Sequence, residues 1–225
     1  MSAKVDLRNL FGTVRDQGAR PTCLAFAASD AHAGLRAGWD PLSCEYVFYH
    51  AQRRAGRPPT KGAFLSDVLA TLREEGQPEE DGWPYLFELP DDLSLYQPPG
   101  SVGDLFGREA EQPCEDVDRL CAAVDAQTPA IVLTKLTRRF FQPPPEGLVD
   151  HDERAQVFPA PRHAVVAVGH GTADGQRAVL IRNSWGASWG RGGHIWLTEP
   201  YLARHMYGLA MLQEACDAPH RAVAA

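Results

Sequence analysis

The chain lacks the features that mark membrane proteins, exported proteins and nucleic-acid-binding proteins. No apolar run approaches the roughly 20 residues that a membrane-spanning helix needs, and the N-terminus Met-Ser-Ala-Lys-Val-Asp has no apolar signal core. Lys and Arg are scattered rather than clustered, and the net charge is −7. There are no internal repeats. These absences predict a cytoplasmic protein, or one that leaves by a route without such a signal, with neither nucleic acid nor membrane as a partner.

Cysteine is scarce and unpaired in sequence. The chain has five, an odd number, and none forms a Cys-x-x-Cys pair. Cys114 and Cys121 have no convincing second pair for zinc, so we expect no metal site and no cofactor. We expect Cys44, Cys114 and Cys121 to be buried apolar residues, because free cysteine is often part of a core.

Composition is that of an ordinary globular enzyme and does not select among enzymes. Hydrophobic residues make up 44% and charged residues 23% of 225 residues, which suits one large domain or two small lobes.

Secondary-structure signals differ between the two halves of the chain. In the first half, helices are predicted over 22–38, 44–54 and 65–75, followed by a long loop from 86 to 113. In the second half, one helix is predicted over 116–126. Short β-like runs follow and predict a small antiparallel barrel or twisted sheet: 130–134, 163–168, 178–181 and 194–197.

Two distant segments carry the residues that indicate chemistry. Gln17 lies six residues before Cys23, which opens a predicted helix, and His163 and Asn183 follow about 140 residues later. Any one of the four could be an ordinary structural residue. Together and in this order they supply a nucleophile, a base, a group that orients the base and an oxyanion donor.

These segments resemble the papain family of cysteine peptidases. The family signature Gln-Gly-x-Cys-Gly-Ser-Cys-Trp-Ala-Phe corresponds to residues 17–26, with four of ten positions changed. The resemblance implies an α+β, papain-like two-lobed fold, with a helical N-terminal lobe, an antiparallel β-barrel-like C-terminal lobe and the active-site cleft between them. We expect 1–225 to be one catalytic domain, with a helical lobe over about 11–112 and a β-rich lobe over 113–225 plus the N-terminal strand.

The resemblance also implies a role for each residue. Cys23 would be the nucleophile of a thiol-dependent endopeptidase that forms an acyl-enzyme, and His163 its base. Asn183 would orient His163, and Trp185 would shield that bond from water. Gln17 would donate to the oxyanion alongside the backbone N–H of Cys23.

The substrate-binding segment departs from the family pattern. Of the glycine pair that binds extended peptide only Gly62 remains, beside Lys61. Arg162 places a cation next to the base. This cation would favour the Cys23 thiolate and oppose a charged His163, and the sequence leaves the sign of the net effect open. The resemblance places an apolar pocket for the side chain two residues before the cleaved bond, lined by Ala63, Leu65, Leu133 and Ala164. Two alternatives therefore stay open: an amidase or transamidase on a non-peptide substrate, and a catalytically vestigial binding protein.

Other departures concern compartment and control. Arg20 and Pro59 stand where secreted members have bridged cysteines, which predicts a fold independent of disulfides. We expect a propeptide-less, disulfide-poor member of bacterial type, because Val5-Asp6-Leu7 follows Met1 almost at once. Its expected partners are a protein or peptide substrate and an inhibitory or regulatory protein that covers Lys61–Leu65 and Pro143–Pro145. His32 is an unlikely base, and His170 is expected to be structural, in a Gly-His-Gly turn.

Overall fold

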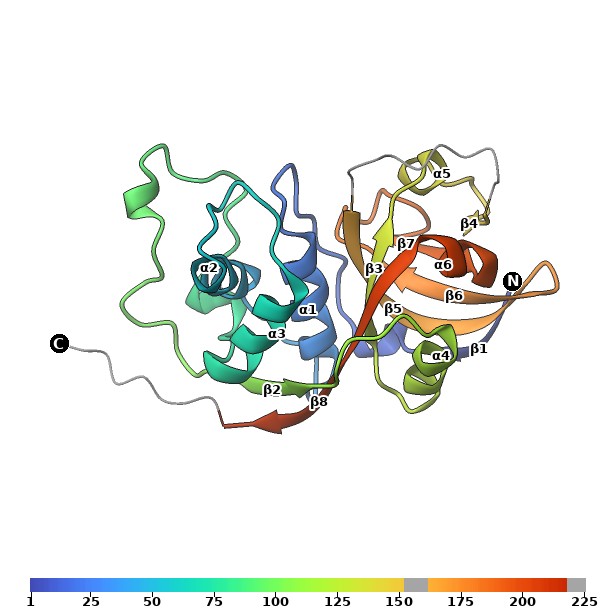
Figure 1. Ribbon diagram of the computed structural model, residues 1–225, viewed down its shortest axis with the longest axis horizontal. Coiled ribbons are helices and arrows are strands. Elements are labelled where there is room, and N and C mark those ends of the chain that lie inside the picture. The colour runs from blue at the N-terminus through green and yellow to red at the C-terminus, as the bar shows by residue number, and fades with distance from the viewer. Residues whose placement is uncertain (152–161, 218–225) are drawn as a thin grey trace. The chain divides into compact units, whose positions relative to one another are not determined.

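The computed structural model describes residues 1–151 and 162–217 (Figure 1). The chain divides into two compact units. Unit 1 comprises Met1–Asp16 and Glu111–Met211, and unit 2 comprises Gln17–Ala110 and the chain from Leu212 onward. The predicted lobes differ from these units at both ends, because residues 11–16 belong to unit 1 and the end of the last strand belongs to unit 2.

Unit 2 is built on three helices, α1 (Cys23–Gly34), α2 (Cys44–Arg54) and α3 (Leu65–Glu74). α1 is rich in alanine, and every residue from Leu24 to Gly34 is buried, so neighbouring segments surround it closely. It ends four residues before the predicted limit, where the backbone N–H groups of Leu35 and Arg36 bond three residues back. α2 has the predicted bounds, and the Ser43 side chain caps its start by accepting from the backbone N–H of Tyr46.

The segment predicted as one long loop contains regular structure. Unit 2 continues through the short 3-10 helices η2 (Glu80–Gly82) and η3 (Leu93–Leu95) to the strand β2 (Gly107–Ala110). β2 pairs antiparallel with the end of β8 (Met206–Cys216), with Gly107 opposite Cys216. A partner more than 100 residues away in sequence therefore creates this strand.

Unit 1 is organised around a sheet of order β8-β3-β5-β6-β7-β4, with β1 also paired to β5. All pairs are antiparallel except β4 with β7. The four predicted strands are present, and all are longer than expected. The strands of unit 1 other than β8 are β1 (Ser2–Asp6), β3 (Ala130–Lys135), β4 (Leu148–Val149), β5 (Arg162–Ala173), β6 (Gln176–Arg182) and β7 (His194–Thr198).

Glycines in β5 allow β1 to lie against it. A Cβ on Gly171 would be 2.1 Å from the carbonyl oxygen of Ser2, and one on Gly169 would be 2.7 Å from that of Val5. His170 between them lies within β5 and bonds to Asp125, so the predicted turn at this position is wrong. The Gly-His-Gly sequence serves close strand packing rather than a turn.

Helices cover the sheet of unit 1 and enclose its core. They are η1 (Arg8–Leu10), α4 (Val117–Asp125), α5 (Arg138–Phe141) and α6 (Glu199–His205). Within the described residues, no helix has both the length and the apolar character to cross a membrane. All five cysteines are free thiols: Cys44 and Cys121 are buried, as predicted, whereas Cys114 is half-buried.

Candidate active site

The first group of candidate site residues lies in unit 2, at the start of α1. Cys23 is the first residue of this helix and its thiol is half-buried. The helix begins with a bond from the backbone N–H of Phe26 to the carbonyl of Thr22. Backbone N–H groups at a helix start carry partial positive charge, which favours a thiolate there.

Gln17 is held in the same loop by its own side chain. Its buried amide Nε2 donates to the backbone carbonyl of Arg20 at 2.8 Å. The backbone N–H of Thr22 donates to the same carbonyl at 2.9 Å. An amide nitrogen carries two hydrogens, so this bond is compatible with donation of the other to an oxyanion.

Two further groups secure this loop, and the sequence gave no reason to select Tyr85 or Glu45, which take part in them. The Tyr85 hydroxyl donates to the backbone carbonyl of Gln17 at 2.7 Å and lies 2.9 Å from the Thr22 hydroxyl. Arg20 forms a bidentate ion pair with Glu45, at 2.6 and 2.8 Å, and Glu45 is fully buried. Burial opposes the charge of Arg20, but the bonds to Glu45 outweigh that effect and raise the pKa of the guanidinium.

The second group of candidate site residues lies in unit 1, on β5 and just after the end of β6. His163 Nε2 and Asn183 Oδ1 are 2.6 Å apart, and both side chains are buried. Because a carbonyl oxygen only accepts, Nε2 carries the proton, and Nδ1 of a neutral His163 is the basic nitrogen. Asn183 Oδ1 also accepts from the backbone N–H of Ser184 at 2.8 Å, which fixes the orientation of its amide.

Burial within unit 1 keeps His163 neutral. Desolvation lowers the pKa of His163 from 6.5 to about 4, and the hydrogen bond that His163 donates to Asn183 only partly opposes this shift. A neutral imidazole is the form that accepts a proton. An anion next to the ring would favour the imidazolium and reverse part of the shift.

Aromatic side chains enclose the His163–Asn183 pair. The Trp185 ring centroid lies 4.6 Å from that of His163, and Phe140 lies 5.9 Å from it on another side. Trp185 in turn contacts Trp189 and stacks on Phe141 at 5.4 Å. This arrangement reduces the access of water to a polar contact, which strengthens it.

The predicted pocket residues of unit 1 lie together on the sheet. Leu133 of β3 is directly opposite Ala164 of β5 and Gly208 of β8, so the three share one face. A Cβ on Gly208 would lie 2.9 Å from a methyl group of Leu133, and Gly208 was not predicted because no local signal marks it. Arg162 is exposed and its guanidinium lies 5.0 Å above the ring of Tyr207.

The predicted pocket residues of unit 2 surround the start of α3. Gly62 is exposed, and a Cβ there would meet only the carbonyl oxygen of Pro21, at 3.9 Å. Ala63 and Leu65 are half-buried. Backbone at Gly62 is therefore accessible to a ligand from one side.

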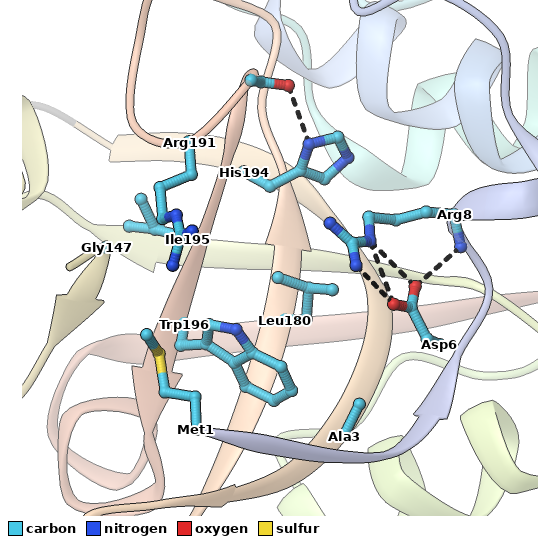
Figure 2. A pocket seen from close by; sticks show the side chains of 11 residues that line it. Met1, Ala3, Asp6, Arg8, Gly147, Leu180, Arg191, His194, Ile195 and Trp196 are labelled. Atoms are coloured by element: carbon cyan, nitrogen blue, oxygen red, sulfur yellow. Dashed lines mark hydrogen bonds and ion pairs between the residues drawn. The ribbon is translucent and has the colours of Figure 1, made fainter. Parts of the chain in front are cut away.

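A cavity elsewhere in unit 1 contains none of the predicted catalytic residues. It measures about 750 Å³, and Figure 2 shows the side chains around it. Arg8 pairs with Asp6 there, and His194 Nδ1 donates to the carbonyl of Gly192 at 2.8 Å. The residues that line it include neither Cys23 nor His163.

Comparison with known proteins identifies the family. The model of the papain family cysteine proteases matches residues 59–213, more than half of the chain, including His163 and Asn183. The chain belongs to the papain family. The match begins after Gln17 and Cys23, so the roles of those two residues rest on the loop described above and on their sequence motif.

Relatives of the papain family extend the similarity over most of the chain. It is 30% identical to cathepsin K of Gallus gallus over 198 residues, which cover 86% of this chain and 55% of the relative. It is 28% identical to cathepsin S of Rattus norvegicus, covering 81% of this chain and 55% of the relative. The chain thus spans about half the length of the curated relatives it matches.

Solved structures show that the fold is the papain-like α+β fold, as predicted. Xylellain, a cysteine protease from Xylella fastidiosa, superposes with a TM-score of 0.74 at 22% identity, covering 95% of this chain and 86% of that chain. The proform of the ragweed pollen cysteine protease Amb a 11 gives a TM-score of 0.73 at 22% identity, covering 94% and 66%. At these identities the likeness establishes the fold alone.

Proposed function

We propose that this papain-family chain is a thiol-dependent endopeptidase that hydrolyses peptide bonds of one or few protein substrates through an acyl-enzyme on Cys23. The observation that carries the proposal is the His163–Asn183 bond, because it leaves His163 Nδ1 as a base in a neutral ring. The cysteine at a helix start and the family match support the same role.

The proposed reaction has two steps. His163 Nδ1 takes the Cys23 thiol proton, sulfur attacks the peptide carbonyl carbon, and Gln17 Nε2 with the Cys23 backbone N–H donates to the oxyanion. The tetrahedral intermediate collapses, and the leaving amine takes the proton from His163. Water then loses a proton to Nδ1, attacks the thioester and releases the acid with the thiol restored.

Substrate selection is proposed from the sheet face and from Gly62. The side chains of Leu133 and Ala164, with Gly208 beside them, present an apolar surface to a substrate side chain. Within unit 2, Ala63 and Leu65 are proposed as further contacts for a substrate side chain, and Gly62 is proposed to pair with extended peptide backbone. Arg162, over Tyr207, and Trp185, against His163, are proposed as further contacts at this site.

Compartment and control are also proposals. The five free thiols support a reducing, cytoplasmic location. An active thiolate there requires restraint, and we propose an inhibitory or regulatory protein that covers Lys61–Leu65 and Pro143–Pro145.

A thiol probe combined with a peptide library tests the proposed function. A peptide epoxide should label wild-type protein at Cys23 and not the Cys23→Ala protein, whereas Cys216→Ala, which removes another half-buried thiol, should label normally. Cleavage of library peptides should be lost in Cys23→Ala and His163→Ala. Labelling without peptide cleavage would favour an amidase or transamidase, and no labelling would favour a vestigial binding protein.

A further inference from the structure

The loop that carries Gln17 and precedes Cys23 is held by a buried network within unit 2. The network centres on the backbone carbonyl of Arg20, which accepts from the Gln17 amide at 2.8 Å and from the Thr22 N–H at 2.9 Å. This carbonyl contacts the Gln17 amide directly and helps to hold it in place. The position of Arg20 therefore matters for the proposed oxyanion donor.

Arg20 is fixed by its side chain from several directions. Its guanidinium is 7% exposed and binds both carboxylate oxygens of Glu45. It also donates to the carbonyl of Leu86 at 2.5 Å, and the Leu86 N–H donates back to Glu45 at 2.9 Å. The Tyr96 hydroxyl donates to Glu45 as well. A planar guanidinium with these partners has one available orientation.

Tyr85 secures the same loop on its other side. Since its hydroxyl donates to the Gln17 carbonyl, it accepts from the hydroxyl of Thr22, which is fully buried and immediately precedes Cys23. Its ring lies edge-on to Phe26 of α1, with centroids 4.7 Å apart, and 5.2 Å from the guanidinium of Arg20. Tyr85 thus links Gln17, the helix start and the ion pair.

We propose that Tyr85 and the Arg20–Glu45 ion pair are positioning residues, which hold the Gln17 amide and the start of α1 in the geometry needed to stabilise an oxyanion. This inference rests on the proposed function and adds to it the groups that act through Gln17. None of the three needs to touch substrate. The buried ion pair and the shared hydroxyl are among the non-covalent contacts that hold the loop.

The test compares turnover with thiol reactivity. Tyr85→Phe removes only the hydroxyl, and we expect kcat on a fluorogenic peptide to fall about tenfold or more with little change in KM, because small misplacements of catalytic groups are costly. Alkylation of Cys23 by iodoacetamide forms no oxyanion, so its rate should stay within about twofold of wild type. Tyr49→Phe, which removes the hydroxyl of another tyrosine of unit 2, should leave both kcat and the rate of Cys23 alkylation unchanged.

A double variant tests whether Tyr85 acts through Gln17. In a Gln17→Ala background, Tyr85→Phe should lower kcat by much less than it does in wild type, because residues that act as a unit are not additive. Glu45→Gln should reproduce the kcat loss if the protein folds. The inference is overturned if Tyr85→Phe lowers kcat by the same factor in wild type and in the Gln17→Ala protein. It is also overturned if the folded Tyr85→Phe protein has the kcat of wild type.

A measurement without catalysis separates this inference from the proposed function. Hydrogen exchange at the Thr22 amide, whose acceptor is the Arg20 carbonyl, should be at least about tenfold faster in Tyr85→Phe and unchanged in Tyr49→Phe. Unchanged exchange in Tyr85→Phe overturns the inference even if the wild type cleaves peptides. If the wild type shows no Cys23-dependent cleavage, the proposed function is overturned, whatever the exchange rate. The catalytic role of the positioning residues is then overturned with it.

Discussion

Lowering the pH from 7 to 5 should strongly destabilise this protein, because buried histidines are held neutral. Burial is the main cause that lowers the pKa of His32 to about 3, and those of His163 and His194 to about 4. An unfolded chain binds protons at these rings near pH 6.5. The stability contributed by the three rings is therefore fully present above pH 6.5 and is lost as the pH falls toward 4.

The magnitude follows from proton linkage. A histidine with a native pKa of about 4 and an unfolded pKa of 6.5 loses about 2 kcal/mol of folding free energy between pH 7 and pH 5. Three such groups give about 6 kcal/mol, a large part of the 5–15 kcal/mol typical of a folded protein. Asp6 and Asp125 hardly contribute in this window: hydrogen bonds lower their pKa values, so the stability that they provide is lost mainly below about pH 4.

Urea unfolding of the Cys23→Ala protein, which cannot digest itself, measures this loss at both pH values. His32→Asn is the matched variant, because an amide replaces the ring nitrogen that donates to Gln77 but does not titrate. Its loss between pH 7 and pH 5 should be smaller than that of the parent protein by about 2 kcal/mol. Equal losses in the two proteins, or a parent whose stability is flat over this range, would refute the reasoning.

Three other expectations follow from particular contacts. Gln17→Ala should lower kcat by about 10²–10³-fold with a modest change in KM, measured by steady-state cleavage of a fluorogenic peptide, and a change in KM alone would exclude the oxyanion role. Dithiothreitol should leave the thermal midpoint nearly unchanged because all five cysteines are free, and a large fall by calorimetry would reveal a disulfide. Gly171→Ala should cost about 1–3 kcal/mol in urea unfolding because its Cβ would meet the Ser2 carbonyl at 2.1 Å, whereas Gly100→Ala, with nothing within 4 Å, should be close to neutral; equal effects would argue against the β1 packing.

Local signals predicted the local structure of the chain well. The bounds of α2 were predicted because Ser43 is a good cap and the apolar residues after it recur with a helical period. The His163–Asn183 contact was anticipated because both residues stand in a recognisable motif. In each case the information lies within a few neighbouring residues or in one short pattern.

Some structure that depends on distant partners was not predicted. β8 has no regular alternation around Gly208, and it forms because β3 and β2 lie beside it. Glu45 looks like an exposed residue of the first turn of a helix, yet it is fully buried against Arg20, 25 residues away. Nothing close in sequence to Gly208 or to Glu45 indicates these contacts, since only the fold brings the contacting segments together.

The pairing of the first strand with β5 has a consequence for how the chain is made. Ser2 lies opposite Thr172, so the ribosome adds some 170 residues between the two partners. At the usual 5–20 residues per second this takes roughly 10 to 30 s, during which β1 has no strand to join. β2 likewise emerges long before the end of β8 that completes it. A nascent chain therefore holds an unpaired strand of each unit until the partner strand has been made, and a chain that stops before β8 leaves neither unit whole.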